Sequence, residues 1–339
     1  MNSSQELAET EDRVARWIKQ ASFSSDTKVE FLAGDASDRR FARVIPPNSR
    51  TSILVVHNNS IDPTQLPMLQ VTELFRKLPV NVPTIHSIAP ELGIVVLEDL
   101  GDTTLESAVS TSTKEQRTRY YQEAVTIIGT IQRGSRQSST TENIAFSVAF
   151  DLDKLLFELN FFVQHFLVNY LGCSVPRKAQ EHLDAEFHKL ASEMSEEPRV
   201  LCHRDFHSRN LMVHKSRLYV IDLQDARMGP DTYDLASLLR DSYMELPTEE
   251  VEQLLGLYSQ LMNVSDTAAF RERFIRTSLQ RNLKALGTFG YQIAVKGKPR
   301  YAEAIPLTLK YLRKTLSGEP RYQRLYKTLS TLVPELTPS

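Results

Sequence analysis

The chain has 339 residues, of which 41% are hydrophobic and 24% are charged, and its formal net charge is -2. A chain of this length exceeds what one hydrophobic core usually serves, so we expect two lobes. The charge balance offers no basic excess to neutralise a run of phosphates, so we expect no nucleic-acid partner. Two cysteines are too few for a disulfide framework or a cysteine-based zinc site, which favours a reducing compartment.

No segment has the composition of a signal peptide or of a clean membrane span. The first residues are polar and acidic, whereas a signal peptide needs an apolar core. The most apolar stretch, Leu155 to Leu171, is interrupted by polar residues, among them Glu158, Asn160, Gln164 and His165, and is short for a span. We therefore predict a cytoplasmic protein without a membrane partner.

The first hundred residues have the patterns of a strand-rich unit. Short β-branched and apolar runs alternate with turn residues, and two segments show helical spacing. The expected elements are a helix at Asp12–Gln20, strands at Val29–Ala33, Phe41–Ile45 and Ser52–His57, a helix at Pro63–Lys77, and strands at Thr84–Ile88 and Gly93–Glu98.

After residue 100 the pattern changes to long helices. They are expected at Lys114–Arg133, Asp151–Leu171, Arg177–Met194, Thr248–Met262, Thr267–Leu286 and Ala302–Leu316, with two short strands near Leu211–Val213 and Leu218–Ile221. The Ser, Thr and Gln-rich stretch Arg133–Thr141 is expected to be an exposed loop. We therefore predict an α+β protein with a small β-rich N-lobe, residues 1–100, and a larger helical C-lobe, residues 101–339.

One segment carries a chemical pattern. His203-Arg204-Asp205 is followed five positions later by Asn210, and Asp222 closes the next apolar strand. Phosphoryl transfer from ATP needs a carboxylate that orients the acceptor hydroxyl and accepts its proton, and oxygen ligands that hold Mg²⁺ against the phosphates. A strand hairpin would bring Asn210 and Asp222 to one end, beside Asp205. The pattern therefore predicts a kinase site.

Other interpretations of these residues are simpler. A loop aspartate is usually a turn or capping residue, and a lone His-Arg-Asp triplet can arise by chance. Cys202, His203 and His207 could bind zinc, but they lie in an irregular loop without a second ligand pair. The combined spacing favours the kinase interpretation over both.

The motif resembles the aminoglycoside phosphotransferase and choline kinase superfamily, and within it the bacterial anomeric kinases of N-acetylmuramate and N-acetylglucosamine. Phe206 stands where that branch has a tyrosine. The resemblance covers most of the chain through Asp35–Arg40, Leu97–Gly101, His203–Met212, Asp222, Gly229–Asp241, Arg281–Gly287 and Gly297–Tyr301.

The resemblance implies a bilobal, protein-kinase-like fold that uses ATP and Mg²⁺ on a small-molecule substrate, an amino sugar. By position, Asp205 would be the catalytic base and His203 would brace its loop. Asn210 and Asp222 would be the metal ligands, and Asp234 would anchor the loop. The hinge from Glu98 to Leu100 would offer backbone groups to the adenine.

The N-lobe departs from the pattern of many kinases. It has no G-x-G-x-x-G loop, and only Gly34 lies in the corresponding turn. The strand Ser52–His57 has no phosphate-binding lysine, which favours the amino-sugar branch over antibiotic kinases. Arg39 and Arg40 are the candidate phosphate contacts, and their alternative interpretation is a solvated charged pair on a strand edge.

The acceptor site is the least readable part of the sequence. His207, Arg209, Gln224 and Asp225 are candidates to bind the acceptor, and Glu158 with Asn160 is either a pocket-facing pair or part of a surface. His207 and Arg209 favour a neutral or anionic acceptor. An aminoglycoside, choline or homoserine-type kinase is one alternative function, and an ATP-binding pseudokinase is an alternative of another class.

Overall fold

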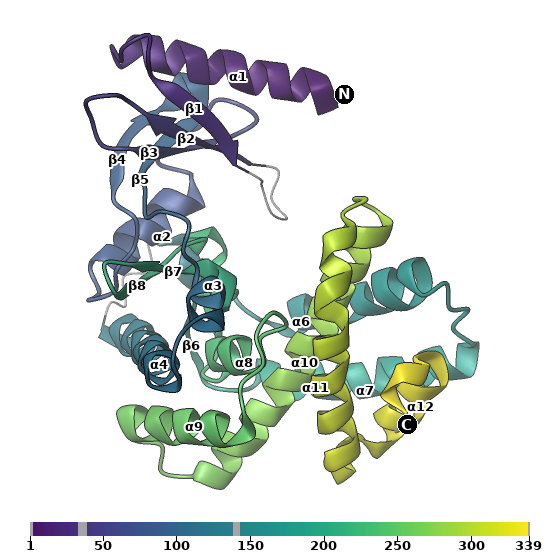
Figure 1. Cartoon of the computed structure of the whole chain (residues 1–339). Coiled ribbons are helices and arrows are strands. Elements are labelled where there is room, and N and C mark those ends of the chain that lie inside the picture. Colours follow the sequence, from purple (N-terminus) through teal and green to yellow (C-terminus); the bar gives the residue numbers. More distant parts are fainter. Residues whose placement is uncertain (1–2, 33–38, 138–142, 338–339) are drawn as a thin grey trace.

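The structure is a computed structural model that describes residues 3–32, 39–137 and 143–337 (Figure 1). The expected turn around Gly34 and the segment Asp35–Asp38 lie outside the described residues. A sheet lies at one end of the molecule and the helices fill the other end. The described part therefore has the expected small β-rich and larger helical regions.

The sheet has five antiparallel strands in the order β1-β2-β3-β5-β4. Its strands are β1 (Lys28–Leu32), β2 (Arg40–Ile45), β3 (Ser52–Val56), β4 (Ile85–Ala89) and β5 (Ile94–Glu98), each within two residues of its expected bounds. Side chains alternate along each strand. Ala42 and Val44 are thus buried against α1 (Ser3–Gln20), through Val14 and Trp17, while Phe41 points to the opposite face.

Helix α2 (Pro67–Arg76) joins the two regions. Val71, Leu74 and Phe75 lie in the same hydrophobic cluster as residues of the helical region. The segment after α2 is also bonded to that region, because Asn81 donates to Leu218 O and its own carbonyl accepts from Val220. The core of the helical region therefore begins before residue 100.

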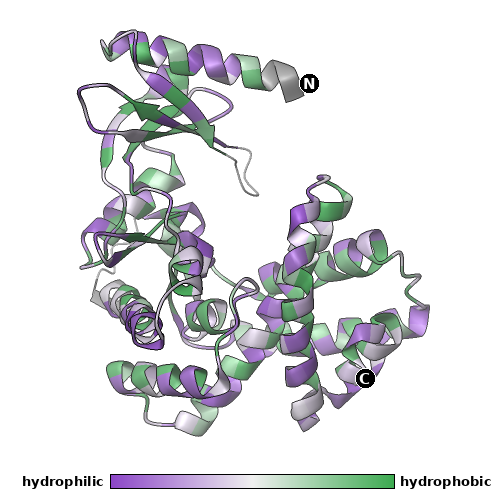
Figure 2. Ribbon diagram, in the orientation of Figure 1, coloured by the Kyte–Doolittle hydropathy of each residue, from purple (hydrophilic) through white to green (hydrophobic). Residues whose placement is uncertain are grey.

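The helical region contains nine labelled helices among its described residues. They are α3 (Leu105–Ser110), α4 (Lys114–Gln137), α6 (Leu152–Phe162), α7 (Arg177–Ser195), α8 (Tyr233–Leu239), α9 (Thr248–Met262), α10 (Thr267–Ala294), α11 (Ile305–Gly318) and α12 (Gln323–Leu332), besides the single turn α5 (Ile144–Ser147). Figure 2 shows that most of them carry both hydrophilic and hydrophobic residues, as helices at the border of a core do.

Helix α10 is packed very closely against α6 and against the π-helix η2 (Val163–Tyr170), which continues α6. A Cβ at Gly287 would lie 2.8 Å from Phe162 Cα, and one at Gly290 would lie 2.3 Å from His165 O. Glycine is required at both positions because the backbones approach within the reach of a side chain. The position of α10 is fixed by this contact.

Some expectations about the helical region are wrong. The stretch Arg133–Thr141 is not a loop throughout, since α4 continues to Gln137 and residues 138–142 are outside the described part. Four short strands are present instead of two: β7 (Leu211–His214) pairs with β8 (Arg217–Val220), and β6 (Arg199–Cys202) pairs with β9 (Arg227–Pro230). In the described part, no helix is long and apolar enough to cross a membrane.

Candidate active site

The loop that carries the predicted base begins where β6 ends and is held by one buried carboxylate. Asp234, at the start of α8, accepts hydrogen bonds from the backbone N–H groups of His203 and Arg204, at 2.7 and 2.9 Å. Arg204 has a φ of 85°, which is unusual for a residue with a side chain. The Asp234 carboxylate therefore holds a backbone turn that the loop would not adopt readily by itself.

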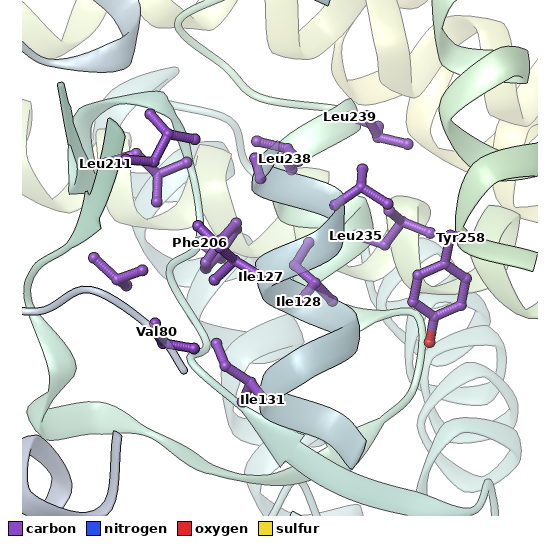
Figure 3. Packing of buried hydrophobic residues seen from close by; sticks show 14 of the residues in the cluster. Val80, Ile127, Ile128, Ile131, Phe206, Leu211, Leu235, Leu238, Leu239 and Tyr258 are labelled. Atoms are coloured by element: carbon purple, nitrogen blue, oxygen red, sulfur yellow. The ribbon is translucent and has the colours of Figure 1, made fainter. Parts of the chain in front are cut away.

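Two further side chains fix this loop from inside the protein. His203 is fully buried, and its Nε2–H donates to Ile221 O at 2.8 Å. Phe206 points into the hydrophobic core, near Ile127 and Leu211 (Figure 3). The contact of His203 suits the bracing role predicted for it and keeps its ring away from the place where a hydroxyl would react.

The carboxylate of Asp205 is surrounded by cations. Lys284 Nζ lies 2.8 Å from Oδ1, Arg281 lies 3.8 Å from the same oxygen, and Arg204 lies 3.7 Å from Oδ2. Burial by itself would raise the pKa of Asp205, but the charges of Lys284, Arg204 and Arg281 outweigh it and hold that pKa well below its usual range. Asp205 is therefore ionised at neutral pH.

Arg204 connects this carboxylate to two others. Its Nη1 lies 2.9 Å from Asp225 Oδ1, and its Nη2 lies 3.7 Å from Glu158 Oε1. Glu158 is buried and also accepts a hydrogen bond from Gln280 at 2.9 Å, whereas Asn160 is exposed. Glu158 and Asn160 thus have different environments: Glu158 contacts Arg204 from behind the cavity, and neither residue lines the cavity itself.

Asn210 comes just before β7 and Asp222 comes just after β8. Both residues therefore lie at the open end of the hairpin, as expected. The side-chain amide of Asn210 donates to Asp205 O at 2.9 Å, which leaves its oxygen for another partner. Asp222 has a left-handed φ of 64°, and its Oδ1 accepts from Gln224 at 2.8 Å. In the described part of the chain, no group of three or more His, Cys, Asp or Glu side chains could hold a metal ion. Two oxygen donors fit Mg²⁺, which keeps several waters and phosphate oxygens as ligands.

Arg39 reaches this hairpin from the sheet. Its Nη1 donates to Gln224 Oε1 at 3.1 Å and its Nη2 donates to Asp222 Oδ1 at 3.2 Å. Arg39 lines the cavity together with Phe41 and Arg43, whereas Arg40, the neighbour between them, does not. This is the alternation expected of consecutive strand residues. Gln224 accordingly lies beside Arg39 and Asp222.

The predicted hinge follows β5. Glu98 donates its backbone N–H to Thr84 O, and its side chain accepts from Thr84 N at 3.1 Å. Leu100 O accepts from His214 Nδ1 at 3.1 Å. Arg43 pairs with Asp99 at 2.8 Å and with Asp102 at 2.7 Å, so this segment is tied to the sheet by ion pairs.

Two of the predicted acceptor residues, His207 and Arg209, lie against Tyr243. Arg209 is paired with Glu106 at 2.7 Å and lies over the Tyr243 ring, with its guanidinium carbon 3.7 Å from the ring centroid. His207 also lies against Tyr243, and burial lowers the pKa of this histidine. The Nδ1 atom of His207 is buried and has no hydrogen-bond partner within the described residues.

One cavity of 840 Å³ joins these groups. It extends from the sheet and the hinge, past Asn210 and Asp222, to Asp205 and the face of α10. Its lining includes Arg39, Glu98, Leu100, Asp205, His207, Arg209, Asn210, Asp222, Gln224, Asp225, Arg281 and Lys284. The described residues predicted for the site line this cavity, except His203 behind the loop and Arg40.

The model of the phosphotransferase enzyme family matches residues 28–272, which include the sheet and the loop with Asp205. The chain belongs to this family. An N-acetylmuramate/N-acetylglucosamine kinase of Neisseria meningitidis serogroup B is 30% identical over 328 residues, covering 95% of each chain. A protein of the same name from Pseudomonas aeruginosa is 27% identical over 307 residues, covering 88% of this chain and 87% of its own.

Solved structures of other kinases have the same fold. A choline/ethanolamine kinase family protein from Mesorhizobium loti has a TM-score of 0.61 at 13% identity and covers 95% of this chain and 99% of its own. Amicoumacin kinase hAmiN also has a TM-score of 0.61, at 14% identity, and covers 92% of this chain and 96% of its own. The expected kinase-like fold is confirmed, and this phosphotransferase is a small-molecule kinase.

Sequence reasoning missed two of the three cations that surround Asp205. Arg281 and Lys284 belong to a segment recognised only as part of the resemblance, with no role assigned to them. Arg281 and Lys284 are three residues apart, so a helical projection of α10 would have placed both of them on one face. Nothing in the sequence indicates that this face meets a loop 79 residues earlier.

Proposed function

We propose that this phosphotransferase moves the γ-phosphoryl group of ATP to the anomeric hydroxyl of an N-acetylated amino sugar, N-acetylmuramate or N-acetylglucosamine. The observation that carries the proposal is Asp205, an ionised carboxylate in a cavity that also reaches Asn210, Asp222 and Arg39. The choice of acceptor is supported by the names of the relatives from Neisseria meningitidis and Pseudomonas aeruginosa. The product would suit the recycling of cell-wall sugars.

In this proposal residues 1–100 bind the nucleotide and residues 101–339 supply the base and bind the acceptor. Glu98 and Leu100 would contact the adenine through their backbone, and Arg39 would turn from Asp222 to the phosphates when a nucleotide is bound. Asn210 and Asp222 would hold Mg²⁺, which neutralises charge on the phosphates. Asp205 would orient the acceptor hydroxyl and take its proton.

The charges on the acceptor side support a neutral or anionic sugar. Lys284 and Arg281 line the cavity next to Asp205. A polycationic aminoglycoside would meet these cations at close range, which is unfavourable in a partly buried site. The anomeric hydroxyl is also more acidic than an ordinary alcohol, which suits a carboxylate base with a low pKa.

The proposal is tested by incubating the enzyme with ATP, Mg²⁺ and either sugar, and assaying reducing ends. Transfer to the anomeric hydroxyl removes the reducing end, and the methyl glycoside should be inert. A fully reducing product, or rapid turnover of the methyl glycoside, would show that a different hydroxyl reacts. Asp205→Asn should lower kcat by about 10² to 10⁴ while nucleotide binding is kept.

A further inference from the structure

Lys284 stands where the acceptor side of the cavity meets the proposed base. Its Nζ donates to Asp205 Oδ1 at 2.8 Å, and its side chain is only 15% exposed. The other cations nearby are bound differently: Arg209 pairs with Glu106, and Arg281 donates to Arg204 O at 2.8 Å. Lys284 is thus the cation that directly contacts the carboxylate of Asp205 at hydrogen-bond distance.

The position of Lys284 is set by backbone packing. Helix α10 approaches α6 and η2 so closely at Gly287 and Gly290 that it has no room to shift toward them. Gly287 is one turn from Lys284, so the backbone of Lys284 is held at a fixed position on the wall of the cavity. A preorganised charge of this kind stabilises a transition state more than a mobile one, because it needs no rearrangement during the reaction.

On the sheet side of the cavity, strand β3 carries no cation, and Arg43 of β2 is already paired with Asp99 and Asp102. Strand β3 turns Ile53 and Val55 toward the cavity, and no lysine lies in this strand. Arg39 enters from the start of β2, at the end of the cavity near Asp222. The reacting phosphoryl group carries negative charge over three oxygens, and a kinase needs cations around them.

The geometry points to the phosphoryl group as the partner of Lys284. An acceptor hydroxyl bonded to Asp205 would have its oxygen about 3 Å from the carboxylate. The phosphorus then approaches that oxygen, so the γ-phosphoryl oxygens come close to a cation that already touches Oδ1. Groups on the far side of a sugar ring would be farther from Lys284.

We propose that Lys284 is a further catalytic residue, whose ammonium contacts the transferring phosphoryl group and supplies the positive charge that β3 lacks. This inference rests on the proposed kinase function of Asp205. The acceptor oxygen forms a bond to the γ-phosphorus as the bond to the β–γ bridging oxygen breaks. The hydroxyl proton goes to Asp205, ADP leaves with the electron pair of the broken bond, and Lys284 stays protonated throughout.

The first test uses Lys284→Met, with Lys284→Arg as the variant that keeps the charge. Lys310→Met is the matched control, because Lys310 lies on α11, is exposed and is paired with Glu245 at 2.7 Å. We expect Lys284→Met to lower kcat by about 10² to 10³ with N-acetylmuramate and with N-acetylglucosamine alike. Lys284→Arg should recover part of this loss, and Lys310→Met should behave like the wild type.

A loss that is confined to the KM of N-acetylmuramate would overturn the proposal, because it would assign Lys284 to the acceptor carboxylate. N-Acetylglucosamine lacks that carboxylate and therefore separates the two roles. An unchanged kcat with both sugars would also overturn it. Binding of ADP and Mg²⁺, measured by calorimetry, verifies that each variant keeps its folded site.

The second test does not depend on the sugar. ADP, Mg²⁺ and aluminium fluoride together mimic the phosphoryl group in transfer, and we expect the wild type to bind this mixture at least about 10²-fold more tightly than ADP and Mg²⁺ alone. Lys284→Met should lose most of this gain without weaker ADP binding. If the wild type shows the gain but phosphorylates neither sugar, only the proposed acceptor is wrong. If Lys284→Met keeps the full gain, the role of Lys284 is wrong.

Discussion

The guanidinium of Arg39 lies 3.2 Å from the carboxylate of Asp222, although the two residues are 183 positions apart. Gln224 completes the contact, since it accepts from Arg39 and donates to Asp222. Hydrogen bonds therefore join the segment that enters the sheet to the hairpin at the edge of the cavity. The carboxylate of Asp222 is also the proposed metal ligand, so Arg39 and the Mg²⁺ of a bound nucleotide would both interact with its negative charge.

The two neighbouring arginines should have separable roles. Arg39→Ala is expected to raise the KM for ATP and to lower kcat by about 10², because it removes a cation that faces the cavity. Arg40→Ala should have little effect on either, because its side chain does not line the cavity. Steady-state kinetics with varied ATP measures both. Equal effects of the two substitutions would place the phosphate contact elsewhere.

The two proposed metal ligands should differ in their contribution. Asp222→Ala removes a charged oxygen ligand and should abolish the Mg²⁺-dependent part of nucleotide binding. Asn210→Ala removes a neutral ligand and should weaken this part less, by about tenfold or less. The measurement is calorimetric titration of ADP with and without Mg²⁺. Mild and equal losses in both variants would argue against the shared metal site.

The predicted chemistry came from short-range spacing, which is why it covered one side of the site. Asp205, Asn210 and Asp222 are separated by a loop and one hairpin, and a hairpin brings its two ends together whatever the rest of the fold does. Lys284 and Glu106 reach the site through tertiary packing of helices, which has no local signature. Arg43 lies in a strand that was expected, but its ion pairs with Asp99 and Asp102 depend on how the strand meets the hinge.

The fold was predictable to a similar extent. The five strands of the sheet and most of the long helices have strong periodic patterns, and their bounds agree within a few residues, but α1 begins earlier than predicted and α10 extends to Ala294 instead of ending at Leu286. Strand β9 was missed because it ends on Gly229-Pro230, which favours a turn, and its partner β6 lies about 25 residues earlier, so no hairpin pattern marks the pair. Helix α8 is buried on all sides, so it lacks the alternation of polar and apolar faces by which helices are recognised.

The anchor of the catalytic loop should be measurable as stability. Asp234→Ala leaves the buried backbone N–H groups of His203 and Arg204 without their acceptor, which costs about 1–3 kcal/mol for each group. Asp234→Asn keeps one oxygen and should lose less. We expect kcat to fall with stability in both variants, because the turn at Arg204 is no longer held. Urea unfolding and kinetics on the same samples test this order, and an Asp234→Ala protein with wild-type stability would contradict it.

Glu197, just before β6, should make stability depend on pH. Its side chain is buried, only 8% of the residue is exposed, and it pairs with Arg276 at 2.8 Å. Burial raises the pKa of Glu197 from 4.5 to about 7, against the opposing charge of Arg276. The folded state therefore binds a proton more tightly than the unfolded state does. The resulting gain in stability grows as the pH falls from about 7 to about 4.5.

The wild type should therefore become more stable between about pH 8 and pH 5, through Glu197, by up to about 3 kcal/mol. Glu197→Gln cannot ionise and should lose this part of the pH dependence, so the difference in unfolding free energy between the two proteins should change with pH. Glu196→Gln is the matched control, because the carboxylate of Glu196 is next in sequence to Glu197 but is exposed. Urea unfolding at several pH values gives the three curves. Parallel curves for the wild type and Glu197→Gln would show that Glu197 is already ionised in the folded protein.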